Sequence, residues 1–269
     1  MPARTSAAAR VKRRPGRRGP VVRVPVLRPL APPLKGSAAG KPRSGEQRAD
    51  FVYAKLREAI RTGRLQPGDR VREIELAAWL NVSRTPVRDA LRRLESERLV
   101  SHAPRRGLIV TELDPQQVLE LYALREVLEG AAANLAARYA SESEVRSLQD
   151  LVARQRAAGD DAHELAGLNR QFHEVLYHAA RNRYLIQALG TLRDSLALLR
   201  DTTYSVSGRP TAALAEHVKI VEAIKRQDSA GADEAARRHI RMASNARLTM
   251  VVGMGAPGAR PPAGSAASR

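Results

Sequence analysis

The organisation of this chain is decided by the stretch Arg72–Glu95, which reads REIELAAWLNVSRTPVRDALRRLE. The stretch predicts two short helices, the first over Glu73–Leu80 and the second after Ser83, with a tight connection between them. Apolar residues recur in the second helix at positions i, i+3, i+4 and i+7 and predict one buried stripe. The stripe consists of Val87, Ala90, Leu91 and Leu94.

The opposite face of the second helix is polar and basic. Its side chains are those of Arg84, Thr85, Arg88 and Arg92. Ser83 is the expected N-cap, and Pro86 is tolerated in the first turn. A helix N-terminus offers free N–H groups and a partial positive charge, and an arginine can bond both O6 and N7 of guanine. This face therefore suits the major groove of DNA.

The segments on both sides of this stretch complete the layout. Apolar residues between Phe51 and Ile60 predict a first amphipathic helix. Two β-like runs, Leu99–His102 and Leu108–Thr111, follow the second helix of the quoted stretch. The loop between them carries residues suited to phosphates or the minor groove, namely Arg105, Arg106 and Gly107. Three helices and a hairpin predict a winged helix-turn-helix domain over residues 51–112.

The rest of the folded chain is expected to be all helical. From residue 113 to residue 251 the apolar pattern has a helical period, and polar or Gly/Pro breaks divide it into about six helices. Short connections between amphipathic helices are typical of an antiparallel bundle. The expected N-caps are Ser141, Ser143 and Asp160. The fold class is therefore mainly α, with a small wing.

Both ends of the chain lack a pattern that could form a packed core. Residues 1–50 contain eight of the sixteen prolines and carry a net charge of +11 out of +18 for the whole chain. Residues 252–269 are rich in Gly, Ala, Pro and Ser. We expect both segments to be disordered, and the first to be a basic tail that favours a polyanionic partner.

Composition excludes several classes of protein. The chain has no cysteine, so it has neither disulfides nor thiolate metal sites nor a cysteine nucleophile. No apolar run approaches the ~18–20 residues that span a bilayer. The apolar segment near the N-terminus is interrupted by Arg23 and Pro25, which argues against a secretion signal. We therefore expect a soluble protein with no membrane partner.

The stretch quoted first resembles the DNA-binding signature of the GntR-type bacterial transcriptional regulators. The resemblance implies that Arg84, Thr85 and Arg88 contact operator DNA and that Gly107 lets the wing approach the DNA backbone. Some branches of the family place an arginine on the preceding helix where this chain has Ile74. The resemblance also implies a double-stranded DNA operator, a homodimer, a place in the bacterial cytoplasm at the nucleoid, and repression of metabolic or transport genes.

A second resemblance covers the helical part of the chain. Leu121–Ala132, LYALREVLEGAA, is similar to the opening helix of the effector domain called FCD, an all-helical bundle in one branch of the GntR regulators. Asn169–His173 resembles the Asp/Asn-x-x-Phe-His element of that domain. His217 and His239 follow in the same order as the other two metal-binding histidines of the domain. The resemblance implies one divalent ion, zinc or nickel, held by Asn169, His173, His217 and His239.

Two points about this site stay open at the level of sequence. Histidines on a bundle helix can also be ordinary hydrogen-bonded core residues, and an asparagine lacks the negative charge with which Asp would strengthen metal binding. Arg125 can pair with Glu129 one turn further on, or reach the pocket and bind the carboxylate of an effector. His163 and His178 are expected to point to other faces of their helix.

Two further functions compete with that of a regulator. His173 and His178 are near the spacing of a zinc protease, but histidines five apart diverge by ~140° on a helix and cannot hold one ion. A three-imidazole metal centre could still make a metal-dependent hydrolase, although no general base is evident. The basic tail alone would suit a non-specific nucleic-acid-binding protein. We predict a ligand-responsive transcription factor that is not an enzyme, whose effector is a small carboxylate metabolite.

Overall fold

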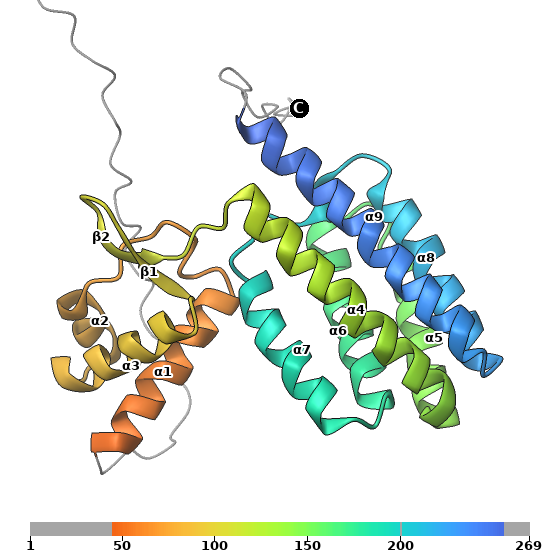
Figure 1. Cartoon of the computed structure of the whole chain (residues 1–269), viewed down its shortest axis with the longest axis horizontal. Coiled ribbons are helices and arrows are strands. Elements are labelled where there is room, and N and C mark those ends of the chain that lie inside the picture. Colours follow the sequence, from red (N-terminus) through yellow and green to blue (C-terminus); the bar gives the residue numbers. More distant parts are fainter. Residues whose placement is uncertain (1–44, 200, 256–269) are drawn as a thin grey trace, which may run out of the picture.

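The computed structural model describes residues 45–199 and 201–255, and Figure 1 shows two groups of elements joined by a short connection. The predictions of disordered ends fall mainly outside these residues. Within them, the first helix begins at Gly45 and the last ends at Gly255, so helices extend beyond both predicted limits. None of the described helices is long and apolar enough to cross a bilayer.

The first group of elements is the predicted winged helix-turn-helix. Its elements are α1 (Gly45–Arg61), α2 (Glu73–Leu80), α3 (Arg84–Ser96), β1 (Val100–Ala103) and β2 (Gly107–Val110). The strands are antiparallel, with Val100 opposite Val110 and Ala103 opposite Gly107. The predicted stripe of α3 is fully buried and packs on α1.

Helix α1 starts six residues earlier than its apolar pattern indicates, and it contacts the end of α3 at Asp50 and Tyr53. Asp50 accepts a hydrogen bond of 3.2 Å from Nη1 of Arg93, and the Tyr53 hydroxyl donates to Glu97 at 2.7 Å. The guanidinium of Arg93 also lies over the Tyr53 ring, 3.7 Å from its centroid. These contacts join residues about 43 positions apart, so a local reading of residues 45–50 could not include them.

The second group is a bundle of six helices, as predicted. They are α4 (Pro115–Tyr139), α5 (Glu142–Ala157), α6 (Ala162–Ala179), α7 (Arg183–Leu196), α8 (Arg209–Lys225) and α9 (Ser229–Gly255), with a short 3-10 turn, η1 (Thr203–Ser205), before α8. Long helices α4 and α9 run side by side in Figure 1 and share the largest helix contact of the bundle. Small residues along α4, such as Ala133 and Ala136, allow this close packing.

The helix caps of the bundle agree with the sequence at one of the three predicted positions. Ser141 begins α5 with a reciprocal capping box to Glu144. The cap of α6 is Asp161, whose carboxylate accepts two backbone N–H bonds, and the prediction of Asp160 was wrong by one residue. Ser143 lies inside α5 and caps nothing; its hydroxyl instead contacts that of Ser141.

The two groups also touch through α1 and α7. The buried carboxylate of Asp194, near the end of α7, accepts a hydrogen bond of 2.8 Å from Nε of Arg57 on α1. Arg61 lies 3.9 Å from the same carboxylate. Leu198, just after α7, is buried in the core of the winged domain. The helical bundle therefore contacts the winged domain by an ion pair and an apolar contact in addition to the covalent connection.

Candidate nucleic-acid interface and metal centre

The face of α3 opposite its buried stripe is open to solvent. Ser83, Arg84, Thr85 and Arg88 are all exposed, at the start of the helix. Ser83 occupies the N-cap position with an extended backbone, but its side chain makes no capping hydrogen bond. The first backbone N–H groups of α3 therefore have no cap from this hydroxyl, which leaves them available to an anionic group.

Both arginines of this face contact one carboxylate that the sequence analysis missed. Glu73, the first residue of α2, accepts hydrogen bonds from Nε and Nη2 of Arg88 at 2.9 and 3.0 Å. It also accepts one from Nη2 of Arg84 at 3.3 Å. The hydrogen bond from Arg88 holds the pKa of Glu73 below its usual value. The only sequence signal was an acidic residue in a first turn, which the helix dipole explains equally well.

The residues of the predicted wing tip lie in different environments. Arg105 is exposed, and Gly107 has a φ of +76°, which favours glycine. Arg106 is turned back into its own domain, where Nη1 donates to Glu112 at 3.0 Å and Nη2 to the carbonyl of Gly68. Of the two arginines, only Arg105 is free of such ties to acidic side chains in the described structure, so it fits the proposed contact better.

The structure brings the three predicted histidines together. His173 on α6, His217 on α8 and His239 on α9 are buried, and one nitrogen of each lies within 4.8 Å of the others. The rings of His217 and His239 have centroids 4.5 Å apart, and Phe172 stacks on His217 at 4.1 Å. Three helices that are separated along the chain thus converge at one point inside the bundle.

Two of the three imidazoles, those of His217 and His239, are held on the Nδ1 side by a hydrogen-bond acceptor, and Nδ1 of His173 lies close to a carboxylate. Nδ1 of His173 lies 2.6 Å from Glu129, that of His217 lies 2.7 Å from Oε1 of Gln155, and that of His239 lies 2.7 Å from Glu216. An amide oxygen or an ionised carboxylate can only accept, so the ring hydrogen is assigned to Nδ1. For His217 and His239 this tautomer directs the lone pair of the ring to Nε2.

The buried Nε2 atoms fit a metal ion. Among the described residues, Nε2 of His173 and Nε2 of His217 have no hydrogen-bond partner. Burial lowers the pKa of His217 and of His239 well below the usual value for histidine, so both rings are neutral as a metal ligand requires. Acceptors that fix the far nitrogen of a metal-binding histidine are the usual support of such a centre.

Arg125 pairs with Glu129, one of the two alternatives left open by the sequence. Burial alone would raise the pKa of Glu129, but Arg125 and His173 lower it below its usual value. Arg125 therefore acts on His173 through this carboxylate. Asn169 lies one turn before His173, and its Oδ1 accepts a hydrogen bond of 3.1 Å from the Tyr204 hydroxyl.

Several polar residues that surround the three histidines had not been assigned to this site from the sequence. They are Glu129, Gln155, Arg209 and Glu216, which come from three helices. Arg209 is buried, donates to Glu216 at 2.8 Å and lies 3.4 Å from His239. His163 and His178, expected on other faces of α6, are exposed.

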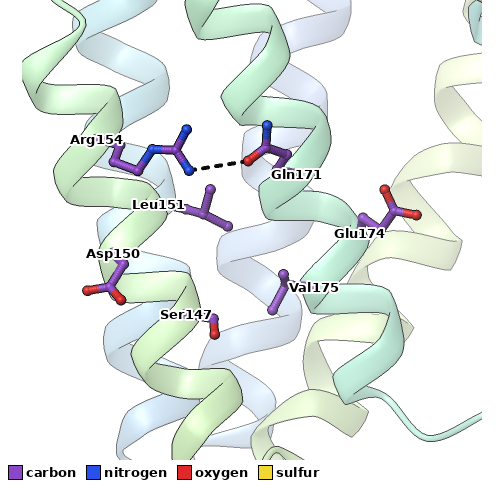
Figure 2. Close-up of a pocket in the computed structure, with 7 residues that line it drawn as sticks. All are labelled: Ser147, Asp150, Leu151, Arg154, Gln171, Glu174 and Val175. Atoms are coloured by element: carbon purple, nitrogen blue, oxygen red, sulfur yellow. Dashed lines mark hydrogen bonds between the residues drawn. The ribbon is translucent and has the colours of Figure 1, made fainter.

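A separate groove of about 420 Å³ lies on the outside of the bundle between α5 and α6. Figure 2 shows its lining, which is Ser147, Asp150, Leu151, Arg154, Gln171, Glu174 and Val175. Arg154 donates to Gln171 at 3.4 Å across it. The three histidines do not line this groove, so it is distinct from the histidine cluster.

Comparison with known proteins agrees with both parts of the fold. Residues 48–110 match the profile of the bacterial regulatory proteins of the gntR family, and residues 120–242 match the FCD domain. The chain is 33% identical over 191 residues to the uncharacterized HTH-type transcriptional regulator YdhC of Bacillus subtilis, covering 70% of this chain and 84% of that protein. It is 32% identical over 194 residues to the probable D-xylose utilization operon transcriptional repressor of Paenarthrobacter nicotinovorans, with coverages of 71% and 83%.

Solved structures show the same architecture. The protein McbR/YncC of E. coli is 25% identical, with a TM-score of 0.63, and the similarity covers 76% of this chain and 97% of that one. A GntR regulator from a Rhodococcus species is 26% identical, with a TM-score of 0.57 and coverages of 77% and 98%. From the two matched domains and these relatives, the chain belongs to the GntR family of bacterial transcriptional regulators, in the group whose second domain is FCD.

Proposed function

We propose that this regulator binds a two-fold operator as a homodimer and that its helical bundle changes operator affinity when it binds a ligand. The observation that carries the proposal is the exposed basic face at the start of α3, with Arg84 and Arg88 opposite the buried stripe. We further propose that it represses metabolic or transport genes, as the name of the relative from Paenarthrobacter indicates for that protein.

Selection of bound DNA from a random pool tests the first part of this proposal. We expect a pseudo-palindromic sequence with two half-sites, because a symmetric dimer reads half-sites about 10 bp apart or a multiple of that. Recovery of unrelated sequences, with binding that depends only on salt, would support the alternative of a non-specific nucleic-acid-binding protein.

For the bundle we propose a divalent metal, zinc or nickel, held by the Nε2 atoms of His173, His217 and His239. Asn169 is the proposed fourth ligand through its amide oxygen. When bound, the ion would supply a positive centre that attracts the carboxylate of a small effector. The unpartnered Nε2 atoms and the fixed Nδ1 sides support this assignment.

For the basic residues before α1 we propose a separate role, which is non-specific electrostatic attraction to DNA without recognition of its sequence. Residues 1–44 carry twelve Lys or Arg and no acidic residue. We expect deletion of residues 1–44 to keep the operator preference and to flatten the salt dependence of DNA binding, by a slope of ~0.9 for each phosphate that the tail neutralises. Measurement of affinity at several salt concentrations checks this. An unchanged slope would show that the tail does not bind DNA.

The contact between α1 and α7 gives the bundle a route to the DNA-binding domain. His173 precedes Glu174, which accepts a hydrogen bond of 3.4 Å from Arg193 on α7. Arg193 precedes Asp194, which binds Arg57 on α1. Movement of α6 or α7 around a bound ion would therefore reach α1 through two ion pairs.

We expect Asp194→Asn to weaken the effect of metal on DNA binding without abolishing either binding event. Allosteric couplings are typically ~5- to 150-fold in affinity, and removal of the charged contact should bring this factor towards one. The measurement is operator affinity with and without saturating zinc. Asp150→Asn on α5, an exposed residue away from α1, is the control. An unchanged zinc response in Asp194→Asn would rule out this route.

Enzymatic activity is the remaining alternative, and the family assignment does not favour it. Assay of the zinc-loaded protein against esters and phosphoesters tests it directly. We expect no turnover above that of a His217→Ala variant. Turnover that depends on the three histidines would support the hydrolase instead.

A further inference from the structure

One carboxylate lies between the two arginines proposed to read the operator. We propose that Glu73 is a positioning residue for DNA recognition, which fixes Arg84 and Arg88 for base contact and opposes their binding to non-operator DNA. This inference rests on the proposed function of those arginines. It assigns to α2 a residue that affects specificity without a base contact of its own.

The geometry shows how Glu73 orders the two side chains. Oε1 receives Nε of Arg88, and Oε2 receives Nη2 of Arg88 and Nη2 of Arg84. The two arginines are one helical turn apart on α3, where like charges repel each other. Because the carboxylate comes from another helix, it reduces this repulsion and ties both guanidinium groups to the rigid frame of α2 and α3.

The contact with Glu73 leaves free the N–H donors of each arginine that would bind a base. A guanidinium has five N–H donors, and Glu73 takes only the Nε edge of Arg88. The opposite edge, formed by Nη1 and the second hydrogen of Nη2, can still bond O6 and N7 of guanine. The side chains of Arg84 and Arg88 remain 57% and 50% exposed while they contact Glu73.

Order before binding has a measurable consequence. A side chain that is already fixed loses less freedom when the complex forms, which is worth about two- to ten-fold in affinity for each side chain. Glu73 therefore favours the operator complex, in which the fixed orientation matches the bases. On other DNA the same orientation finds no matching acceptors.

The charge of Glu73 acts in the same direction. Binding to non-operator DNA is mainly attraction between cations and phosphates. A carboxylate at the DNA-facing surface cancels part of the charge of the two arginines and repels nearby phosphates. Removal of this charge should therefore strengthen non-operator binding, while the accompanying loss of order weakens operator binding.

The chain offers a matched control for the effect of charge. Glu75 lies in the same first turn of α2 and has the same favourable position relative to the helix dipole. Within the described residues it pairs with Arg72 at 3.0 Å and not with Arg84 or Arg88. Glu75→Gln therefore makes the same change of charge two residues away without releasing the arginines.

The experiment compares full-length Glu73→Gln and Glu75→Gln with the unmodified protein. Affinities are measured at one salt concentration for the selected operator and for a scrambled duplex of the same length. We expect Glu73→Gln to lower the ratio of the two affinities about ten-fold, and Glu75→Gln to leave it within about two-fold. An unchanged ratio in Glu73→Gln, or an equal fall in both variants, overturns the proposal.

Two further variants separate this inference from the function on which it rests. In a Glu73→Gln/Arg88→Ala double variant the effect of the glutamine should shrink, because its main partner is gone. Arg88→Ala alone tests base recognition. A fall of the ratio in Arg88→Ala without one in Glu73→Gln overturns only the role of Glu73, whereas no fall in either Arg84→Ala or Arg88→Ala overturns the recognition face itself. Melting curves of each variant confirm that it is folded.

Discussion

Replacement of Arg88 by alanine is expected to lower operator affinity ~5- to 150-fold, the equivalent of about 1–3 kcal/mol for the removal of one bidentate base interaction. The fold should be unaffected, because the side chain is half exposed and lies opposite the buried stripe of α3. Affinity for the selected operator, measured at fixed salt, checks the expectation. Arg84→Ala should behave in the same way at a different base pair.

The control for this experiment must remove a positive charge elsewhere. Arg146 on α5 is exposed and pairs only with Glu142 in the described residues, at 3.3 Å, so Arg146→Ala makes the same change of charge far from α3. Arg88→Lys adds a second comparison, since lysine keeps the charge but cannot form a planar bidentate contact. If operator affinity is unchanged in both Arg84→Ala and Arg88→Ala, the assignment of the recognition face is wrong.

The winged domain could be predicted closely because its signals are local. The stripe of α3 and the bounds of α2 follow from residues within one or two turns of each other. The strands β1 and β2 differ from the predicted runs by one residue, which is the usual uncertainty of element ends. The start of α1 was missed because residues 45–50 carry no apolar repeat, and the contact of Asp50 with Arg93 across the domain is not a local signal.

The cluster of three histidines shows the same limit of local sequence signals. The three histidines were predicted from their order along the chain, by resemblance to FCD. The neighbours of their Nδ1 atoms could not be predicted in the same way, since Glu129 and Gln155 come from helices other than those of His173 and His217. Arg106 was predicted as a cation at the wing tip, but its tie to Glu112 depends on how the strand end folds back.

Replacement of His217 by alanine is expected to abolish tight binding of zinc or nickel, since two imidazoles and an amide oxygen are a poor set of ligands. Ligation stabilises the folded state by mass action, so added zinc should raise the melting temperature of the unmodified protein and leave that of His217→Ala unchanged. His178→Ala, an exposed histidine on α6, should keep the full response.

His217 is fully buried and stacks on Phe172, so its removal can destabilise the bundle for reasons unrelated to metal. Gln155→Leu avoids this ambiguity, because it keeps the imidazole and removes only the acceptor of its Nδ1 hydrogen. Removal of such a supporting acceptor typically costs 10–100-fold in metal affinity. Asn169→Asp should have the opposite effect, since an anionic oxygen replaces a neutral one.

The decisive measurement is metal content after dialysis against a weak chelator, with each variant measured beside the unmodified protein. The order of affinity should be Asn169→Asp, then the unmodified protein, then Gln155→Leu, with no tight binding in His217→Ala. This order separates metal binding from loss of the fold. Gln155→Leu keeps all proposed ligands and removes only the acceptor of the His217 Nδ1 hydrogen. An unmodified protein that retains no metal, and whose melting curve no divalent ion shifts, would return the three histidines to hydrogen-bonded core residues.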